Sequence, residues 1–100
     1  MKIITVCGSL KFKDEMMKTA LKVELEGNCV LTPIYPIGDD KDIFTEEEAK
    51  ILDDMHRVRI KMSDSILVIN VDGYIGESTK REIELAKSLN KEIIYYTDLV

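Results

Sequence analysis

The chain has 100 residues, of which 45% are hydrophobic and 33% are charged, and its formal net charge at pH 7 is −5. A chain of this length buries roughly two-thirds of its unfolded surface in one core, so we expect a single domain over residues 1–100. The acidic balance disfavours nucleic acid polymers and anionic membranes as partners, and any phosphate that the protein recognises is expected to be small and locally held.

The first predicted element is a strand over Lys2–Cys7, a β-branched run that ends at Gly8. We expect that the run is not a signal peptide, because Lys11 and Lys13 cut it short and no small-residue cleavage site follows. Nowhere else does the chain approach the ~20 apolar residues that span a bilayer, so we expect a cytoplasmic protein. Cys7 and Cys29 both lie in strand-like segments, and we expect buried, reduced thiols at both positions.

Helical and strand patterns then alternate along the chain. A helix is predicted over 12–26, closed by Gly27 and Asn28, and a second strand over 29–34, closed by two prolines. Residues 35–44 read as a loop that is rich in glycine and aspartate, whose acidic part, 39–42, is interpreted as a solvated lid.

A second helix is predicted from Thr45 to about Ser63, because Thr45 and Glu48 fit a capping box. Apolar residues repeat along it at helical spacing: Ile51, Met55, Val58 and Met62. A strand over 65–71, a helix over 79–89 and a last strand over 92–96 follow.

This alternation predicts a single α/β domain of flavodoxin-like or Rossmann-like outline, with a mostly parallel sheet of four or five strands and helices on both faces. In such sheets ligands bind beyond the carboxyl ends of the strands. Three segments meet that rule: 8–11, 35–44 and 72–82.

The last of these segments carries the strongest signal for a site. The apolar run 66–69 opens into a turn rich in Gly, Ser and Thr, and a helical pattern that contains Glu82 follows. The start of such a helix offers free backbone N–H groups and the positive end of the helix dipole, which suit an anion or a sugar. Glu82, one turn into the helix, places a carboxylate beside that point.

The sequence lacks the motifs of several alternative functions. No P-loop sequence and no Gly-x-Gly-x-x-Gly occurs, which argues against a P-loop nucleotidase and against dinucleotide binding. One histidine and scattered carboxylates give no metal-ligand spacing, so we expect no metal site.

Three blocks, Val6–Lys11, His56–Asp64 and Gly76–Ala86, give the chain a resemblance to the nucleoside 2-deoxyribosyltransferase-like superfamily, which includes the deoxynucleoside 5'-monophosphate N-glycosidases. The run Gly-Tyr-Ile-Gly-Glu-Ser-Thr is also similar to that of small, poorly characterised bacterial and phage-type proteins. The resemblance implies cleavage or exchange of the N-glycosidic bond of a nucleoside or its 5'-monophosphate. It also implies a homodimer or larger assembly, and no cofactor.

The resemblance carries over onto individual residues. Glu82 takes the position of the nucleophile, which attacks the anomeric carbon of the sugar. Ser9 matches a serine that contacts the sugar or its phosphate, Lys11 matches a position often occupied by arginine, and Ser78 lies near the 5' phosphate. The remaining predicted substrate-binding residues are Gly8, Tyr74, Gly76 and Thr79.

The chain departs from the family pattern at three positions. Thr5 stands where an aromatic hydroxyl orients the nucleophile, and His56 stands where an aspartate is the candidate proton donor to the leaving base. A further carboxylate of the transferases falls near Gly76, so Asp72 or Glu77 would have to replace it.

Two other interpretations stay open. The departures at Thr5 and His56 fit a non-catalytic module that binds or senses a nucleotide. In a purely structural interpretation, Thr79 and Glu82 form a capping box at the start of the last helix, and Glu82 only bonds back to the backbone.

Overall fold

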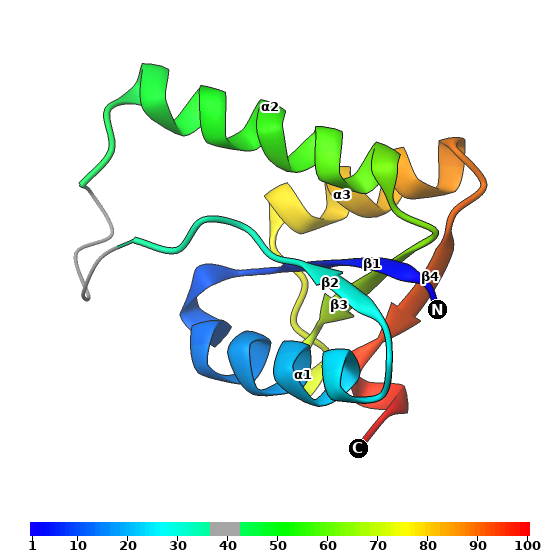
Figure 1. Ribbon diagram of the computed structural model, residues 1–100. Coiled ribbons are helices and arrows are strands. Elements are labelled where there is room, and N and C mark those ends of the chain that lie inside the picture. The colour runs from blue at the N-terminus through cyan, green and yellow to red at the C-terminus, as the bar shows by residue number, and fades with distance from the viewer. Residues whose placement is uncertain (37–42) are drawn as a thin grey trace.

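A computed structural model describes residues 1–36 and 43–100, and in these residues a four-stranded parallel sheet forms the centre of the molecule (Figure 1). The strands lie in the order β2-β1-β3-β4. Their bounds are β1 Ile3–Gly8, β2 Cys29–Leu31, β3 Ser65–Ile69 and β4 Glu92–Tyr95. The predicted α/β fold with a parallel sheet is confirmed.

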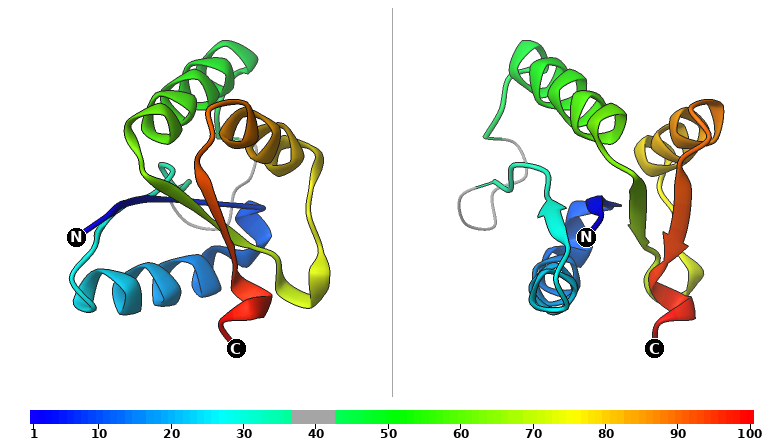
Figure 2. Two further views of the ribbon diagram at one scale, coloured as in Figure 1. Left: turned by 90° about the vertical axis from the view of Figure 1, so that its right-hand side faces the viewer. Right: turned by 45° about the vertical axis from the view of Figure 1, so that its right-hand side comes forward.

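Three helices cover the sheet, α1 (Lys13–Leu25), α2 (Glu46–Met62) and α3 (Glu77–Ser88). Figure 2 shows α2 and α3 together on one face and α1 on the other. The predicted capping box starts α2, because the Thr45 side chain accepts from the Glu48 N–H and the Glu48 carboxylate accepts from the Thr45 N–H. Short 3₁₀ turns follow β1, β3 and β4.

Each face of the sheet has its own core. Successive strand residues point to opposite faces, so alternate residues of β1 and β3 divide between two clusters of buried side chains. The cluster against α1 contains Ile4, Val6, Met16, Ala20, Val23, Leu67 and Ile69. The cluster against α2 and α3 contains Cys7, Ile60, Ile66, Val68, Ile83 and Ala86. Every residue of β3 is buried, as expected for a central parallel strand.

The last helix begins earlier than its pattern predicts. Its N-cap is Gly76, with no side-chain cap, and Thr79 is the third helical residue. The predicted capping box between Thr79 and Glu82 is therefore wrong, and Glu82 lies in the second turn with its side chain free for another role. Leu89, expected on the inner side, is 39% exposed at the helix end.

Two further expectations differ from the structure. The second strand ends at Leu31 rather than at residue 34, since the prolines that follow cannot extend the ladder. Cys29 is exposed on this edge strand, whereas Cys7 is buried as predicted. The loop acids at 39–42 lie outside the described residues. None of the described helices combines the length and the apolar character that crossing a membrane requires.

Candidate active site

A cavity of about 450 Å³ lies at the carboxyl end of β1, where the connections from β1 and β3 run to opposite faces of the sheet. A Cβ atom on Gly8 would lie 3.2 Å from the Ile69 carbonyl oxygen, so the close approach of the two strands favours glycine there. The cavity is lined by Gly8, Leu10, Pro33, Ile34, Phe44, Thr45, Glu46, Ala49, Leu52, Asp53, His56, Ser78 and Glu82.

Glu82 is a buried carboxylate in this cavity, with 9% of its surface exposed. Burial raises its pKa from the ordinary value of 4.5 to about 7, and the negative charge of Asp53 acts in the same direction. Hydrogen bonds from Cys7 and Ser78 oppose this shift, because they stabilise the ionised form. The carboxyl group of Glu82 therefore changes its charge near neutral pH.

His56 projects from the inner face of α2 toward Glu82. Its Nε2 atom lies 4.0 Å from Glu82 Oε1 and 3.7 Å from Cys7 Sγ. Burial and the positive charge of Arg59 lower the pKa of His56 from 6.5 to about 4. At pH 7 the imidazole is neutral, so it and Glu82 form no ion pair, and their separation of 4.0 Å is longer than a hydrogen bond.

Arg59 also fixes the tautomer of His56. Its Nη1 atom lies 3.4 Å from His56 Nδ1, and a guanidinium group can only donate. Nδ1 therefore accepts, and the ring proton is assigned to Nε2, which faces Cys7 and Glu82. The site thus presents an N–H donor beside the carboxylate.

Cys7 is buried beside these two groups, and burial together with the charge of Glu82 raises its pKa well above the ordinary value. It is a neutral thiol, not a nucleophile. A Cys-His-acid triad places the acid on the ring nitrogen that does not face the thiol. Here Glu82 and Cys7 face the same nitrogen, so the arrangement does not match such a triad.

Cys7, His56 and Glu82 also form a possible set of metal ligands, with their donor atoms within 4.8 Å of one another. In a tetrahedral zinc site, sulfur and nitrogen ligands lie about 3.6 Å apart, close to the 3.7 Å between Cys7 Sγ and His56 Nε2. However, a metal on Nε2 would move the ring proton to Nδ1, where it would face the Arg59 donor. The tautomer therefore disfavours metal binding at these three side chains.

The structure brings four of the predicted site residues together in the cavity: Gly8, His56, Ser78 and Glu82. Lys11 and Tyr74 lie outside it and contact each other, with Lys11 Nζ 3.3 Å from the centre of the Tyr74 ring. Tyr74 in turn packs edge-on against Phe12.

The other predicted residues also do not line the cavity. Ser9 and Gly76 cap the starts of a 3₁₀ turn and of α3, and Thr79 is buried in the first turn of α3. Asp72, with φ of 55°, is exposed on the turn after β3, and it therefore has no part in the mechanism proposed below.

Sequence reasoning missed Asp53, which lines the cavity one turn before His56 on the same side of α2. Asp53 Oδ2 lies 3.4 Å from Arg57 Nε. Asp53 precedes the single histidine, His56, by three residues, and this spacing was the signal that the two side chains lie together on the helix. The apolar repeat of the helix lies on its opposite face and gives no sign of Asp53.

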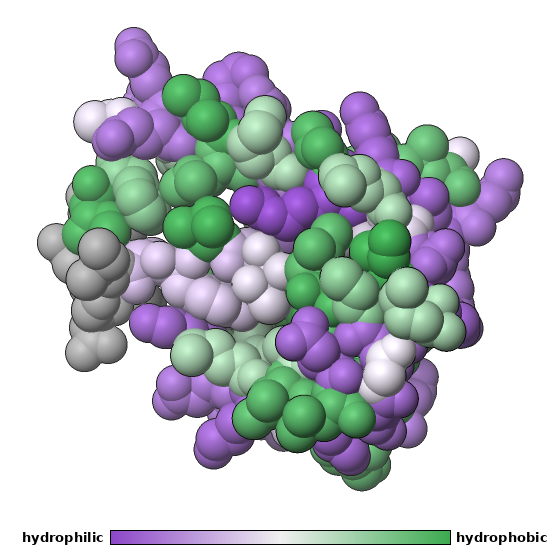
Figure 3. Space-filling model, viewed as in Figure 1, coloured by the Kyte–Doolittle hydropathy of each residue, from purple (hydrophilic) through white to green (hydrophobic). Residues whose placement is uncertain are grey.

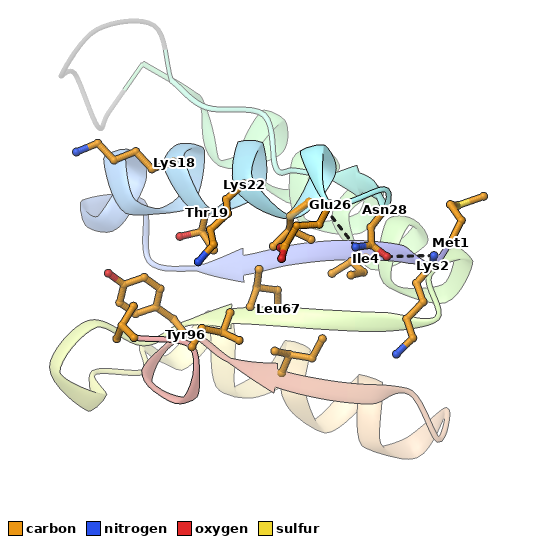
Figure 4. Close-up of a pocket in the computed structure, with 14 residues that line it drawn as sticks. Met1, Lys2, Ile4, Lys18, Thr19, Lys22, Glu26, Asn28, Leu67 and Tyr96 are labelled. Atoms are coloured by element: carbon orange, nitrogen blue, oxygen red, sulfur yellow. Dashed lines mark hydrogen bonds between the residues drawn. The ribbon is translucent and has the colours of Figure 1, made fainter.

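A larger hollow, of about 590 Å³, lies on the other face of the sheet (Figure 4). Lys18, Thr19 and Lys22 of α1 flank it, and Ile4 and Leu67 contribute to its apolar floor. None of the titratable residues that line this hollow is buried. Its volume alone does not identify a catalytic site.

Comparisons with known proteins show a likeness in fold. No family model matches the chain, and no curated protein matches it. Among solved structures, the CMP N-glycosidase BcmB of Clostridium botulinum superposes with a TM-score of 0.60 at 20% sequence identity. The match covers 94% of this chain and 67% of that one. At this identity the likeness shows a shared fold.

Proposed function

We propose that the protein cleaves the N-glycosidic bond of a nucleoside 5'-monophosphate, with Glu82 as the nucleophile. The observation that carries the proposal is the pairing of a buried carboxylate and a neutral imidazole, Glu82 and His56, 4.0 Å apart in one cavity at the carboxyl end of the sheet. The shared fold with a CMP N-glycosidase supports the same class of reaction.

In the proposed first step, ionised Glu82 attacks C1' of the sugar and forms a glycosyl ester. The C1'–N bond breaks, and its electron pair leaves with the base. In the second step water attacks C1', and the ester bond returns its electrons to Glu82. The proton that the water loses balances the proton that the departed base takes up. The net reaction consumes one water and yields the free base and the sugar 5'-phosphate. Exchange onto a second base would replace that water.

The neighbours of Glu82 have distinct proposed roles. The Nε2–H group of His56 donates a hydrogen bond to the leaving base, because the neutral ring cannot act as a strong acid at pH 7. The Cys7 thiol holds the carboxylate of Glu82 in place, as the hydrogen bond between them indicates. Thr5 does not supply this contact, since its hydroxyl bonds to the Ser63 hydroxyl and to the Arg59 carbonyl.

The phosphate is proposed to bind at the start of α3. The N-cap of this helix is Gly76, and no side chain caps its first N–H groups, so they are open to an anion. Ser78 lies on this turn and lines the cavity. A phosphate here and a sugar over Glu82 would span one turn of the helix.

The test is base release from a panel of nucleoside 5'-monophosphates and nucleosides, CMP and its deoxy form included, resolved by chromatography. Glu82→Gln keeps the shape of the side chain but removes the nucleophile, and base release should fall at least ~10³-fold. Glu84→Gln, an exposed change on the same helix, is the matched control and should retain full activity.

Each outcome has a definite meaning. Release that persists in Glu82→Gln would remove Glu82 as the nucleophile. Tight binding of a monophosphate without any release would favour the non-catalytic binding module, which the departures at Thr5 and His56 predicted. Absence of both binding and release across the panel would reject the nucleotide site altogether.

A further inference from the structure

The hollow of about 590 Å³ on the α1 face lies over three neighbouring strands. Its apolar floor takes one residue from each of them, Ile4 of β1, Leu67 of β3 and Ile94 of β4. Because α1 packs mainly over β1 and β2, the hollow opens beside it, over β3 and β4. Figure 4 shows α1 as one wall and the 3₁₀ turn Tyr96–Asp98 as the other.

The shape of this surface sets it apart from the other exposed apolar side chains. Those along α2 lie on an outer surface among hydrophilic side chains, at the top of the molecule in Figure 3. In the hollow the apolar residues line a concave surface instead. Small-molecule sites are mostly apolar clefts of roughly 300–1,000 Å³ with a few polar groups, and the hollow falls within that range.

Three polar side chains point into the hollow from its two walls. Thr19 and Lys22 extend from α1, and Tyr96 extends from the opposite wall (Figure 4). Within residues 1–36 and 43–100, the ammonium group of Lys22 has no ion-pair partner. In the same residues neither hydroxyl group makes a hydrogen bond. All three groups can therefore donate to a ligand.

The charge of the lining indicates which kind of ligand fits. Three lysines line the hollow, Lys2, Lys18 and Lys22, against the single acidic side chain of Glu26. Lys2 already pairs with Glu92, so the open positive charge comes from the two lysines of α1. This local excess occurs in a chain whose net charge is −5. Only Lys22 points inward in Figure 4, which suits an anion of one charge.

We propose that this hollow is a second, non-catalytic binding site for a small carboxylic acid with an apolar body. The body covers the apolar floor, and the carboxylate accepts hydrogen bonds from Lys22, Thr19 and Tyr96. None of the titratable residues that line the hollow is buried, so its groups bind rather than react. The site lies on the opposite face of the sheet from Glu82 and does not depend on the proposed reaction.

The first test is a titration with octanoate, followed by two-dimensional NMR of the backbone amide groups. Signals from the second half of α1, from β4 and from the turn after it should shift, and those around Glu82 should not. Octan-1-ol has the same apolar chain without the charge, so it should bind at least ~5-fold more weakly.

The second test compares two lysines in matched positions. Lys22 and Lys87 are both exposed and both lie in the last turn of their helices, α1 and α3. Lys22→Glu should weaken octanoate binding at least ~10-fold, because it sets a like charge beside the carboxylate. Lys87→Glu changes the net charge equally and should leave the Kd unchanged. Tyr96→Phe keeps the ring and removes one donor, so binding should weaken about 3-fold.

Several results would overturn the proposal. One is the absence of amide shifts at ~10 mM octanoate, a concentration that detects even a weak small-molecule site. Others are shifts centred on Glu82 and His56, equal affinity for octan-1-ol, and equal losses of affinity in Lys22→Glu and Lys87→Glu. Shifts of the same signals with protein concentration alone would show that a second copy covers the hollow. Because none of these readouts uses base release, failure here leaves the proposed reaction standing, and failure of the reaction leaves this site standing.

Discussion

Both faces of the sheet pack against helices, but they bury different kinds of side chain. The face under α2 and α3 has the smaller cavity, about 450 Å³, and holds Glu82, His56 and Cys7 buried together. The face under α1 has the larger hollow, about 590 Å³, whose charged residues are exposed at its rim. Burying a titratable group is unfavourable, so a fold retains such a group where something other than packing requires it.

The buried titratable groups, rather than the volume of the cavity, distinguish the candidate site from the hollow on the other face. On the α2 and α3 face, burial moves the pKa of Glu82 upward and that of His56 downward, so both are largely neutral just below pH 7. On the α1 face, the buried residues are apolar and contribute packing.

Apart from the loss expected in Glu82→Gln, the largest expected effect is the pH dependence of base release. Glu82 must be ionised to act as a nucleophile, and its pKa is about 7. We expect kcat/KM to rise about 100-fold between pH 5 and pH 8 and to level off above pH 7. His56 titrates near pH 4, below this range, and should not bend the profile. A level profile from pH 5 to pH 8 would place the essential group elsewhere.

A change on the α1 face should act on stability alone. Leu67 is 1% exposed and packs in the cluster against α1, so Leu67→Ala should lower the free energy of unfolding by about 3 kcal/mol. The kcat/KM of the folded fraction should stay the same. Ile83→Ala is the counterpart in the other cluster, next to Glu82, and should reduce both stability and kcat/KM. Denaturant titration measures the stability, and base release measures kcat/KM. Equal losses of kcat/KM in Leu67→Ala and Ile83→Ala would contradict the assignment of the activity to the α2 and α3 face.

Glu82→Gln should stabilise the protein at alkaline pH even though it removes the proposed nucleophile. The pKa of Glu82 is about 7 in the folded state and ordinarily 4.5, so the folded state keeps a proton that the unfolded state releases. Its contribution to stability is fully present below pH 4.5 and is lost as pH rises through 7. Glutamine escapes this loss, and at pH 8 the variant should unfold with a free energy about 2 kcal/mol higher than wild type.

His56 gives this measurement an internal check. Its pKa falls from 6.5 to about 4 on folding, so its contribution is present above pH 6.5 and is lost as pH falls toward 4. In the wild type the two slopes oppose each other between pH 4.5 and 6.5, and stability should be nearly level there. In Glu82→Gln the slope of His56 remains alone, and stability should rise with pH. Equal urea midpoints for both proteins at pH 8 would contradict the burial of a charged Glu82.

The sequence was sufficient for the features that depend on local chemistry. The alternation of strands and helices, the capping box at Thr45 and the turn after β3 all follow from residues near one another in the chain. Glu82 and His56 were both predicted in the site from the resemblance, and the structure brings them to 4.0 Å.

The features that depend on tertiary packing were not predictable. The periodicity of α2 shows an apolar row, but it does not say whether that row faces the sheet or the solvent, and here the sheet takes the side with His56 and Ile60. Lys11 was expected at the ligand, yet its ammonium group lies over the ring of Tyr74. Asp53 lines the cavity because it lies on the same side of α2 as His56, and that side faces inward.

The smallest expected effect concerns the start of α2, which forms the rim of the cavity. Thr45→Ala removes the side-chain acceptor for the Glu48 N–H group and should lower the free energy of unfolding by about 1 kcal/mol. Because Thr45, Glu46 and Ala49 line the cavity, fraying of this turn should raise KM more than it lowers kcat. Thr45→Ser keeps the cap and should restore both values. An unchanged KM in Thr45→Ala would show that substrate does not reach this end of the cavity, and the site would then narrow to the part nearest Glu82, His56 and Ser78.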